Sequence, residues 1–401
     1  MNDAVISHPS EESKRNLLKT ANDMLAVVYI CASTAFVNNV NLVFVSLALF
    51  GSVTFLNAYL EGRRLNLFIL WGVFFYGFCL LSRLWANNPA GTSAYVGTMI
   101  RMMLLSAIIS MYSERSMEVD IVFKSVIISA GILAFRLAVS TSFEDWGAER
   151  VGANVGMNAN GVGVIFACAS VACLNYANKA KPYLLLFALY TALTMFTGSR
   201  RAFILIFIVV LLFFINNIKK PSSLFYIIPF GAVMALLVYV SMNNPTIYSV
   251  LGVRLEGLLN LTSGEGKVDA STLVRMDLIS IGISLFKENM LIGYGINSFQ
   301  YMNKYSLYSH NNYIELLVNF GLIGTILYYI VPVAVLLKSV VIWMTKTREV
   351  IIAIVFMTIT LVGDYGTISY DSTLNIIILA ASYRAVVIWD ARPKAIASEK
   401  G

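Results

Sequence analysis

Charged side chains are scarce in this sequence. They make up 13% of the 401 residues, whereas soluble globular proteins carry roughly 25%. Hydrophobic residues reach 58% and the mean hydropathy is +0.75, an excess that a folded chain cannot cover with a polar surface. The apolar residues form continuous runs, which excludes the alternating pattern of an outer-membrane barrel. The composition therefore predicts an all-α polytopic membrane protein.

Residues that hold metals or nucleotides are also few. The four cysteines lie in apolar runs without metal-ligand spacing, which indicates small buried side chains. No Walker A loop and no DxD-type carboxylate pair is present, so we expect no cofactor and no metal. The tripeptide GYG at 293–295 lacks the surrounding sequence of a potassium filter. Of the two histidines, His8 lies in a polar N-terminal segment and His310 precedes a long apolar run.

The long apolar runs divide the chain into candidate membrane spans. A helix needs about 20 residues to cross the hydrocarbon core, and we identify twelve candidates. They are 21–38, 40–60, 66–86, 95–113, 121–141, 158–177, 182–197, 201–217, 222–241, 312–337, 347–364 and 371–390. The predicted organisation is a cytoplasmic tail (1–20), nine spans (21–241), a long periplasmic segment (242–311), three spans (312–390) and a second cytoplasmic tail (391–401). The polar N-terminus predicts that no signal peptide is cleaved.

Lysine and arginine near the span ends set the predicted orientation. With both termini in the cytoplasm every inside segment is basic, and the outside turns NNPAGTS and DYGTISYD contain neither residue. The outside face nevertheless has basic residues of its own. They are Arg150, Arg200, Arg201, Arg254, Lys267, Arg275, Lys287 and Lys304. The net charge of +7 thus belongs to membrane-flanking loops and does not indicate nucleic-acid binding.

The segment 242–311 is too long for a bare connection, and long loops are usually functional. Within it, DASTLVRMDLISIGISLFKEN has apolar residues at helical spacing. We expect an amphipathic helix on the outer membrane surface, capped by Ser271 or Thr272. Arg275 on this helix is either a solvated surface charge or part of a functional site, and Arg254 in the same segment is a candidate substrate contact.

Arg200 and Arg201 follow the outside turn TGSRR at the start of a span. Either side chain could lie among lipid headgroups, because long basic side chains keep their charge in water. A phosphate-binding role is the alternative, since guanidinium makes bidentate hydrogen bonds to phosphate oxygens and a helix start adds exposed amides. Arg101, within a predicted span, is a further residue of interest because intramembrane charges usually face a cavity.

His310 lies in the stretch YSHNNYIELLVNFGLIG. It is either a structural residue at a helix start, where Asn311 or Asn312 would be the cap, or a general base with an ordinary pKa of about 6.5. Three further groups are candidate substrate contacts, each with a purely structural alternative. They are Asn311, the pair Asn158 and Asn160 in GANVGMNANGVGV, and the pair Asp364 and Asp371 that flank the last outside turn.

The order of these motifs resembles that of the O-antigen ligase and polymerase superfamily of bacterial envelopes. The motifs are GANVGMNANGVGV, TGSRR, STLVRMDL, GYGINSF and SHNNYIELLVNFGLIG, and they span roughly the C-terminal two-thirds of the chain. The resemblance implies a GT-C-type glycosyltransferase with a large periplasmic segment. It also implies a multi-pass protein of the bacterial inner (cytoplasmic) membrane whose active site faces the periplasm.

The resemblance further implies a reaction and a set of residues. The donor is a glycan on undecaprenyl diphosphate, and the transfer is metal-independent and inverting. The family's paired arginines correspond to Arg200 and Arg275, with Arg201 as an alternative for the first, and its histidine corresponds to His310. Asp364 and Asp371 compete for its acidic position.

Two members of the superfamily fit the sequence. A polymerase joins lipid-linked repeat units of O-antigen or exopolysaccharide, with a glycan acceptor and a possible chain-length regulator as partner. An O-antigen ligase transfers the lipid-linked polysaccharide to lipid A-core. We favour the polymerase on the similarity around His310. A lipid or glycan transporter is a remote alternative, because the polar residues gather at one face and the two halves do not match.

Overall fold

The computed structural model describes residues 11–88, 91–142, 145–146, 150–177, 179–217, 227–257 and 270–392. These ranges contain helices and no β-strand. In chain order the helices are α1 (Glu11–Ala35), α2 (Val40–Leu60), α3 (Leu67–Leu81), α4 (Ser93–Tyr112), α5 (Ser116–Ser140), α6 (Ala159–Ala177), α7 (Pro182–Phe196), α8 (Arg200–Asn217), α9 (Ile227–Asn243), α10 (Pro245–Ile247), α12 (Ala270–Glu288), α13 (Asn312–Thr345), α14 (Ile351–Gly363) and α15 (Thr373–Ala391).

The helices follow the predicted spans closely. Each of the twelve ranges overlaps one helix, from α1 to α9 and from α13 to α15. Eight described helices are long and apolar enough to cross a membrane, namely α2, α3 with its 3-10 extension, α4, α5, α6, α8, α13 and α15. The 13 residues of α14 rise only about 20 Å. A polytopic membrane protein is therefore confirmed, whereas twelve crossings and the GT-C fold stay predictions.

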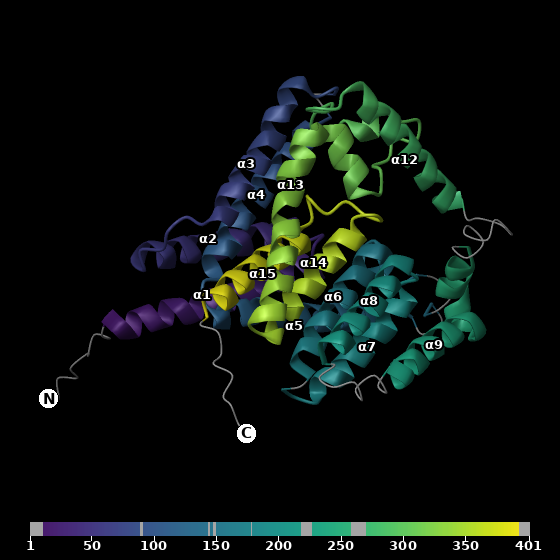
Figure 1. Ribbon diagram of the computed structural model, residues 1–401, viewed down its shortest axis with the longest axis horizontal. Coiled ribbons are helices and arrows are strands. Elements are labelled where there is room, and N and C mark those ends of the chain that lie inside the picture. Colours follow the sequence, from purple (N-terminus) through teal and green to yellow (C-terminus); the bar gives the residue numbers. More distant parts are fainter. Residues whose placement is uncertain are drawn as a thin grey trace.

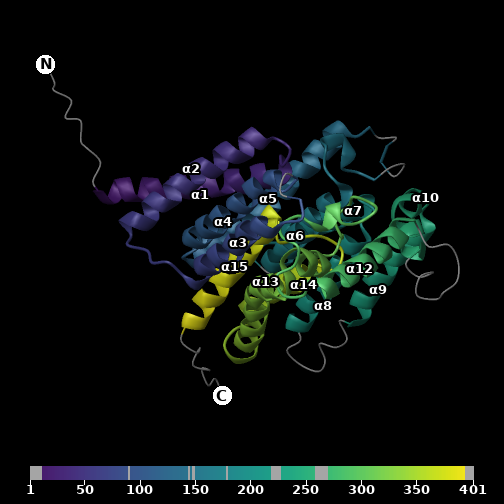
Figure 2. The same ribbon diagram turned by 90° about the horizontal axis from the view of Figure 1, so that it is seen from above.

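The bundle is built around α6 and α15, which are the most buried of the candidate spans. Helix α6 packs against α5, α7, α8 and α14, and α15 packs against α4, α5, α13 and α14. Viewed from above, α1 and α2 lie on one side of this centre and α9 lies at the opposite edge (Figure 2). Large apolar side chains such as Leu185 and Phe74 remain 75% and 67% exposed, as expected where lipid is the solvent.

The loops segregate onto two opposite faces of the bundle. On one face, hydrogen bonds join loops far apart in sequence, from Asn38 to Gly156, from Asn87 to Tyr294 and from Asn312 to Asp364. We call this the α12 face, because α12 lies across its top (Figure 1). The described chain starts and ends toward the opposite face, where ion pairs join Lys19 to Glu61 and Arg63 to Glu118. The predicted outside turns therefore share one face.

Helix α12 occupies the position of the predicted amphipathic helix. It begins at Ala270, so Ser271 and Thr272 lie within its first turn and the prediction that one of them caps it is wrong. Residues 258–269, which include Lys267, lie outside the described ranges. Helix α12 buries Leu278 and Gly282 against α13, where Gly282 has no room for a Cβ beside Ile314.

Helix α13 differs from the single predicted span 312–337. Its backbone leaves the helical conformation at Gly321, where φ is +63°, a value that glycine adopts without steric cost. The break frees carbonyls that receive the GYG segment, because Tyr294 N donates to Val318 O at 2.8 Å and Gly295 N to Asn319 O at 2.7 Å. The arm 322–345 alone is about 36 Å long, enough to cross the membrane. The arm 312–320 is therefore not needed to cross the membrane, and it begins directly after His310.

Candidate functional site

The segment around His310 is fixed by its neighbours on both sides. Asn311 caps α13, since its side-chain oxygen accepts from Tyr313 N at 3.0 Å and Ile314 N at 3.2 Å. Ser309 Oγ donates to Asn311 O at 2.7 Å. His310 itself has a φ of +55°, a strained conformation for a residue other than glycine and one that often occurs at functional sites.

The imidazole of His310 is half-buried and lies against Tyr308, with ring centroids 4.0 Å apart. Burial, and then the nearby guanidinium of Arg275, lower its pKa to about 4. His310 is consequently neutral at physiological pH and has a nitrogen lone pair that can accept a proton. Arg275 lies on α12. Helix α12 therefore brings this arginine close to His310, although the two residues belong to separate sequence motifs.

Asn312 ties this segment to the loop between α14 and α15. Its Nδ2 donates to Asp364 Oδ2 at 3.1 Å, and its backbone N–H donates to Asp364 O at 2.7 Å. Its Oδ1 accepts from the amides of Ser369 and Tyr370. The side chain is completely buried, so these bonds set the distance between His310 and the loop 364–372.

The turn TGSRR sends its two arginines in different directions. Gly198 turns the chain with a φ of +58°, and Ser199 Oγ accepts from Ala202 N to begin α8. Successive residues of a helix point about 100° apart. Arg200 reaches outward, where Nη1 donates to Arg254 O and Nη2 to Thr272 Oγ1, both at 3.1 Å. It thereby fastens the start of α12 and the segment at Arg254 to α8.

Arg201 points into the bundle instead. Its Nε and Nη1 are buried and have no hydrogen-bond partner within the described part of the chain. The side chain passes the last outside turn, since a Cβ added to Gly366 would lie 3.1 Å from its Cδ. Leaving buried donors unpaired is costly, by about 1–3 kcal/mol for each group, so the guanidinium of Arg201 is a candidate anion-binding group.

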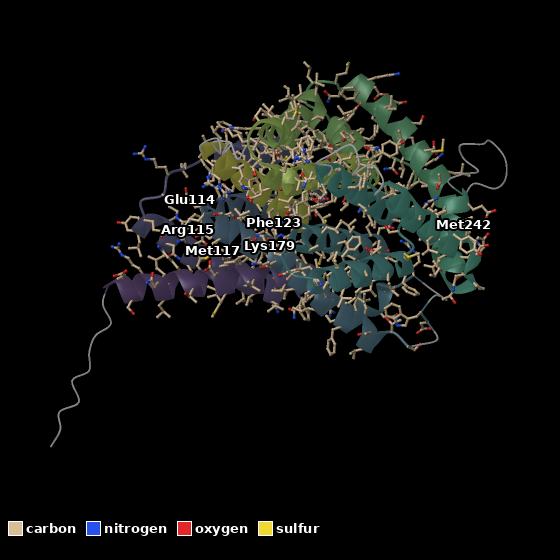
Figure 3. The ribbon with its side chains drawn as sticks, turned by 60° about the horizontal axis from the view of Figure 1, so that its bottom comes forward. Glu114, Arg115, Met117, Phe123, Lys179 and Met242 are labelled. Atoms are coloured by element: carbon tan, nitrogen blue, oxygen red, sulfur yellow. The ribbon has the colours of Figure 1, made fainter. Side chains whose placement is uncertain are left out.

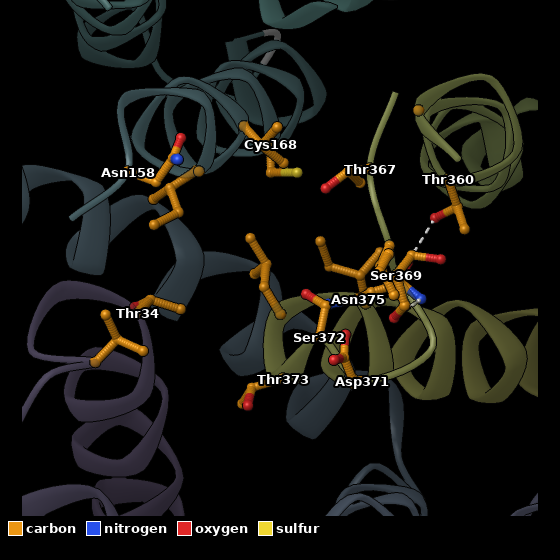
Figure 4. Close-up of a pocket in the computed structure, with 18 of the residues that line it drawn as sticks. Thr34, Asn158, Cys168, Thr360, Thr367, Ser369, Asp371, Ser372, Thr373 and Asn375 are labelled. Atoms are coloured by element: carbon orange, nitrogen blue, oxygen red, sulfur yellow. Dashed lines mark hydrogen bonds between the residues drawn. The ribbon is translucent and has the colours of Figure 1, made fainter. Parts of the chain in front are cut away.

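Arg201 lines a cavity of about 410 Å³ that opens between α1, α4, α6, α8, α14 and α15. Cys168 of α6 and Asn158, which directly precedes that helix, lie along one side, Thr34 of α1 lies on another, and Asp371 lies shortly before α15 (Figure 4). Hydroxyl and amide side chains suited to sugars recur along the wall. They are Ser33, Thr34, Asn38, Asn158, Thr360, Thr367, Ser369, Ser372, Thr373 and Asn375.

Both candidate acids lie at this cavity. Asp364 Oδ2 accepts from Tyr329 OH at 2.7 Å, while its Oδ1 is buried without a partner among the described residues. Asp371 Oδ2 accepts from Tyr95 OH at 2.5 Å. Arg101 lines the cavity too, and its Nε is likewise buried and unbonded there. The two acids and two arginines thus bring charged groups into a cavity that helices of the bundle enclose.

The remaining predicted residues form the rim. Asn160 Oδ1 accepts from Arg150 Nη2 at 2.6 Å, and Arg150 Nε donates to Thr197 O at 2.8 Å. Burial, then the guanidiniums of Arg254, Arg275 and Arg200, lower the pKa of Arg150 to about 10. These residues thus create one positive region beside the cavity.

In the sequence alone, Arg150 is only an exception to the charge difference between the two predicted membrane faces. Its role in the rim was detectable in principle, because it precedes the glycine-rich entry to α6 by a few residues. Asn312 was considered only as a helix cap, and its long-range bonds carry no local signal. The described residues contain no group of three His, Cys, Asp or Glu side chains placed to hold a metal ion.

The comparison with known families bears on the same region. Residues 185–329 match a family model described as O-antigen ligase, a range that contains Arg200, Arg201, Arg275 and His310. No curated protein matches the chain significantly. The match confirms the resemblance to the O-antigen ligase and polymerase superfamily, and it ends before Asp364.

Proposed function

Residues 185–329 carry the features of the O-antigen ligase and polymerase superfamily, and on that premise we propose that the chain is a membrane-embedded glycosyltransferase. It transfers a glycan from undecaprenyl diphosphate to an acceptor hydroxyl, and in its polymerase form joins lipid-linked repeat units. The observation that carries this proposal is Arg201, whose buried Nε and Nη1 have no partner among the described residues, in a cavity with hydroxyl and amide groups along its wall.

The arginines stabilise the leaving diphosphate. Arg201 supplies bidentate hydrogen bonds to the phosphate oxygens, and Arg275 adds charge from the α12 side. Arg200 has a positioning role, because its hydrogen bonds to Arg254 O and Thr272 hold the helix that carries Arg275. This assigns to Arg201 the ligand role that the resemblance alone gives to Arg200.

His310 accepts the proton of the acceptor hydroxyl. The hydroxyl oxygen attacks the anomeric carbon, the bond from that carbon to the diphosphate oxygen breaks, and the electron pair leaves with the diphosphate. Attack opposite to departure gives inversion. An imidazole with a pKa near 4 is a weak base, but a bound diphosphate places negative charge beside Arg275 and raises the pKa of His310 toward its ordinary value.

The α12 face is then the periplasmic face. The ion-paired loops and both chain ends lie in the cytoplasm, in keeping with the excess of Lys and Arg in the predicted inside segments. The donor's lipid tail stays in the outer leaflet, and α12 lies above it. Asn158, Asp364 and Asp371 face the cavity as glycan contacts.

An O-antigen ligase is the second candidate, favoured by the description of the matched family model. The two functions share the donor and differ in the acceptor. Lipopolysaccharide gels from a deletion strain separate them. Core that carries a single repeat unit identifies a polymerase, whereas bare core with polymer held on undecaprenyl diphosphate identifies a ligase. A ladder restored by His310→Ala at equal protein level would remove the general-base role.

A further inference from the structure

A second cavity opens on the face opposite α12. It has a volume of about 640 Å³ and lies among the ends of α5, α6, α8, α14 and α15. Figure 3 brings this side forward and shows three of its residues, Met117, Phe123 and Lys179, close together. Four of its helices also line the candidate catalytic cavity, at their other ends. The two cavities are therefore separated by most of the thickness of the bundle.

The rim of this cavity has more positive than negative charge among the described residues. Its two acids are already in ion pairs, Asp120 with Lys124 at 2.6 Å and Glu349 with Arg392 at 3.3 Å. Lys179 and Arg348 add two further cations. The Lys179 ammonium lies 5.4 Å from the ring centre of Tyr176, which orients it along the rim.

Arg348 is held at the rim by its neighbours. Its Nη1 donates to Asn216 O at 2.6 Å, and its guanidinium lies 5.4 Å from the ring centre of Trp343. Trp343 Nε1 in turn donates to Asn216 Oδ1 at 2.7 Å. Arginine next to tryptophan at helix ends is typical of the membrane interface, where charged and aromatic groups meet lipid headgroups.

The inner wall of the cavity is apolar. It consists of aliphatic and aromatic side chains from the five helices. They are Val119, Phe123, Leu174, Phe213, Ile351, Ile352, Ile388 and Trp389. A ligand that fits both parts has an anionic end at the rim and hydrocarbon below it. Basic pockets between helix ends bind anionic lipid headgroups in other membrane proteins.

We propose that this cavity binds an anionic phospholipid of the surrounding membrane, with its headgroup phosphate against Lys179 and Arg348. The lipid joins the ends of five helices, so its binding stabilises the folded bundle. The site is independent of the proposed glycosyl transfer, because none of its residues lies on the α12 face.

The test is a thermal titration of the purified full-length protein in detergent. Dioctanoyl phosphatidylglycerol should raise the midpoint of thermal unfolding, and dioctanoyl phosphatidylcholine at the same concentrations should not. Lys179→Ala/Arg348→Ala should increase the half-effective concentration of phosphatidylglycerol at least about tenfold, the effect of roughly 1.4 kcal/mol. Arg83→Ala/Lys287→Ala, which removes equal charge from the α12 face, is the matched control and should behave as wild type.

The side chain of Arg348 has a structural contact, so Lys179→Ala alone provides the second variant. It is exposed and should weaken the phosphatidylglycerol effect by at least about threefold without loss of fold. Equal responses to the two lipids, or an unchanged response in both variants, would overturn the proposal. So would an equal midpoint rise with inorganic phosphate, which would show that the rim binds the anion without the lipid. The titrations contain no glycan, so a negative result would not bear on the proposed glycosyl transfer. That proposal is tested separately by the lipopolysaccharide gel.

Discussion

Replacing Arg201 by methionine should separate stability from activity. Methionine fills much of the same volume, so little cavity is created. Two buried donors, Nε and Nη1, have no partner in the described structure, and each such group costs about 1–3 kcal/mol. Their removal should leave the midpoint of thermal unfolding unchanged or raise it. The loss of an electrostatic ligand for the leaving diphosphate should lower the transfer rate about 10²–10³-fold.

Arg200→Met is the contrasting variant. Its guanidinium donates hydrogen bonds to Arg254 O and Thr272 Oγ1, and each bond from a charged donor contributes about 1.5–3 kcal/mol. Because Arg200 is partly exposed, we expect a total loss toward the lower end of that range and a lower midpoint. The two arginines are sequence neighbours with the same charge, so the comparison isolates their surroundings.

The assay combines two readouts on each variant. Fluorescence-detected size-exclusion chromatography after heating gives the midpoint, and lipopolysaccharide gels of the complemented deletion strain give the activity. Arg201→Met alone leaves the carboxylate of Asp364 without its neighbouring positive charge, which could itself lower the midpoint. The double variant Arg201→Met/Asp364→Asn removes both charges and controls for this effect. If Arg201→Met destabilised the protein as much as Arg200→Met while the ladder persisted, Arg201 would be a structural residue and the anion site would be abandoned.

Three further predictions follow from the site. Gly321→Val should abolish folding or strongly lower the midpoint, because φ is +63° and a Cβ there overlaps the backbone of Leu291; a wild-type midpoint would contradict the break in α13. On the acid side, kcat/KM should decline around pH 4 rather than pH 6.5, because burial lowers the pKa of His310 to about 4. Arg275→Gln should move this decline to higher pH, and a decline at pH 6.5 in the wild type would contradict the buried environment. Asn312→Ala should lower kcat more than it changes KM, as measured in membranes, since it frees the segment that carries His310, whereas equal loss of expression would indicate a purely structural role.

The pH dependence of stability has the same origin. The folded-state pKa of His310 is about 4, below the unfolded value of about 6.5. Between these values the unfolded chain binds more protons than the folded chain, so stability falls as the pH is lowered through this window. Above 6.5 neither state is protonated there, and the contribution of His310 is constant.

Regular patterns in the sequence were enough to predict the positions of the helices and two local features. Continuous hydropathy located the helices. The asparagines before an apolar run limited the cap of α13 to Asn311 or Asn312, and Asn311 is the one that accepts two amide hydrogen bonds. The amphipathic pattern located α12. Each of these depends on residues within a few positions of one another, where the helical repeat fixes the geometry.

Features that depend on distant partners were not predictable in the same way. Gly321 lies within an apolar run that hydropathy interprets as one helix, and the break is explained by backbone hydrogen bonds to the distant segment 290–295. Arg200 and Arg201 are indistinguishable by composition, and their roles diverge because α12 lies on one side of α8 and the cavity on the other. Asn312 acquires its partners from residues 364–370.

The low pKa of His310 also bears on the order of events in the proposed reaction. A histidine beside Arg275 in an empty site is a weak base, so it has little tendency to activate water or an acceptor without a donor present. Binding of the diphosphate offsets the positive field of Arg275, Arg201 and the rim, and the pKa of His310 rises as a result. Proton removal from the acceptor would then depend on the donor being bound. The positive cluster around Arg150 would thus bind the leaving group and also couple general-base catalysis to donor occupancy.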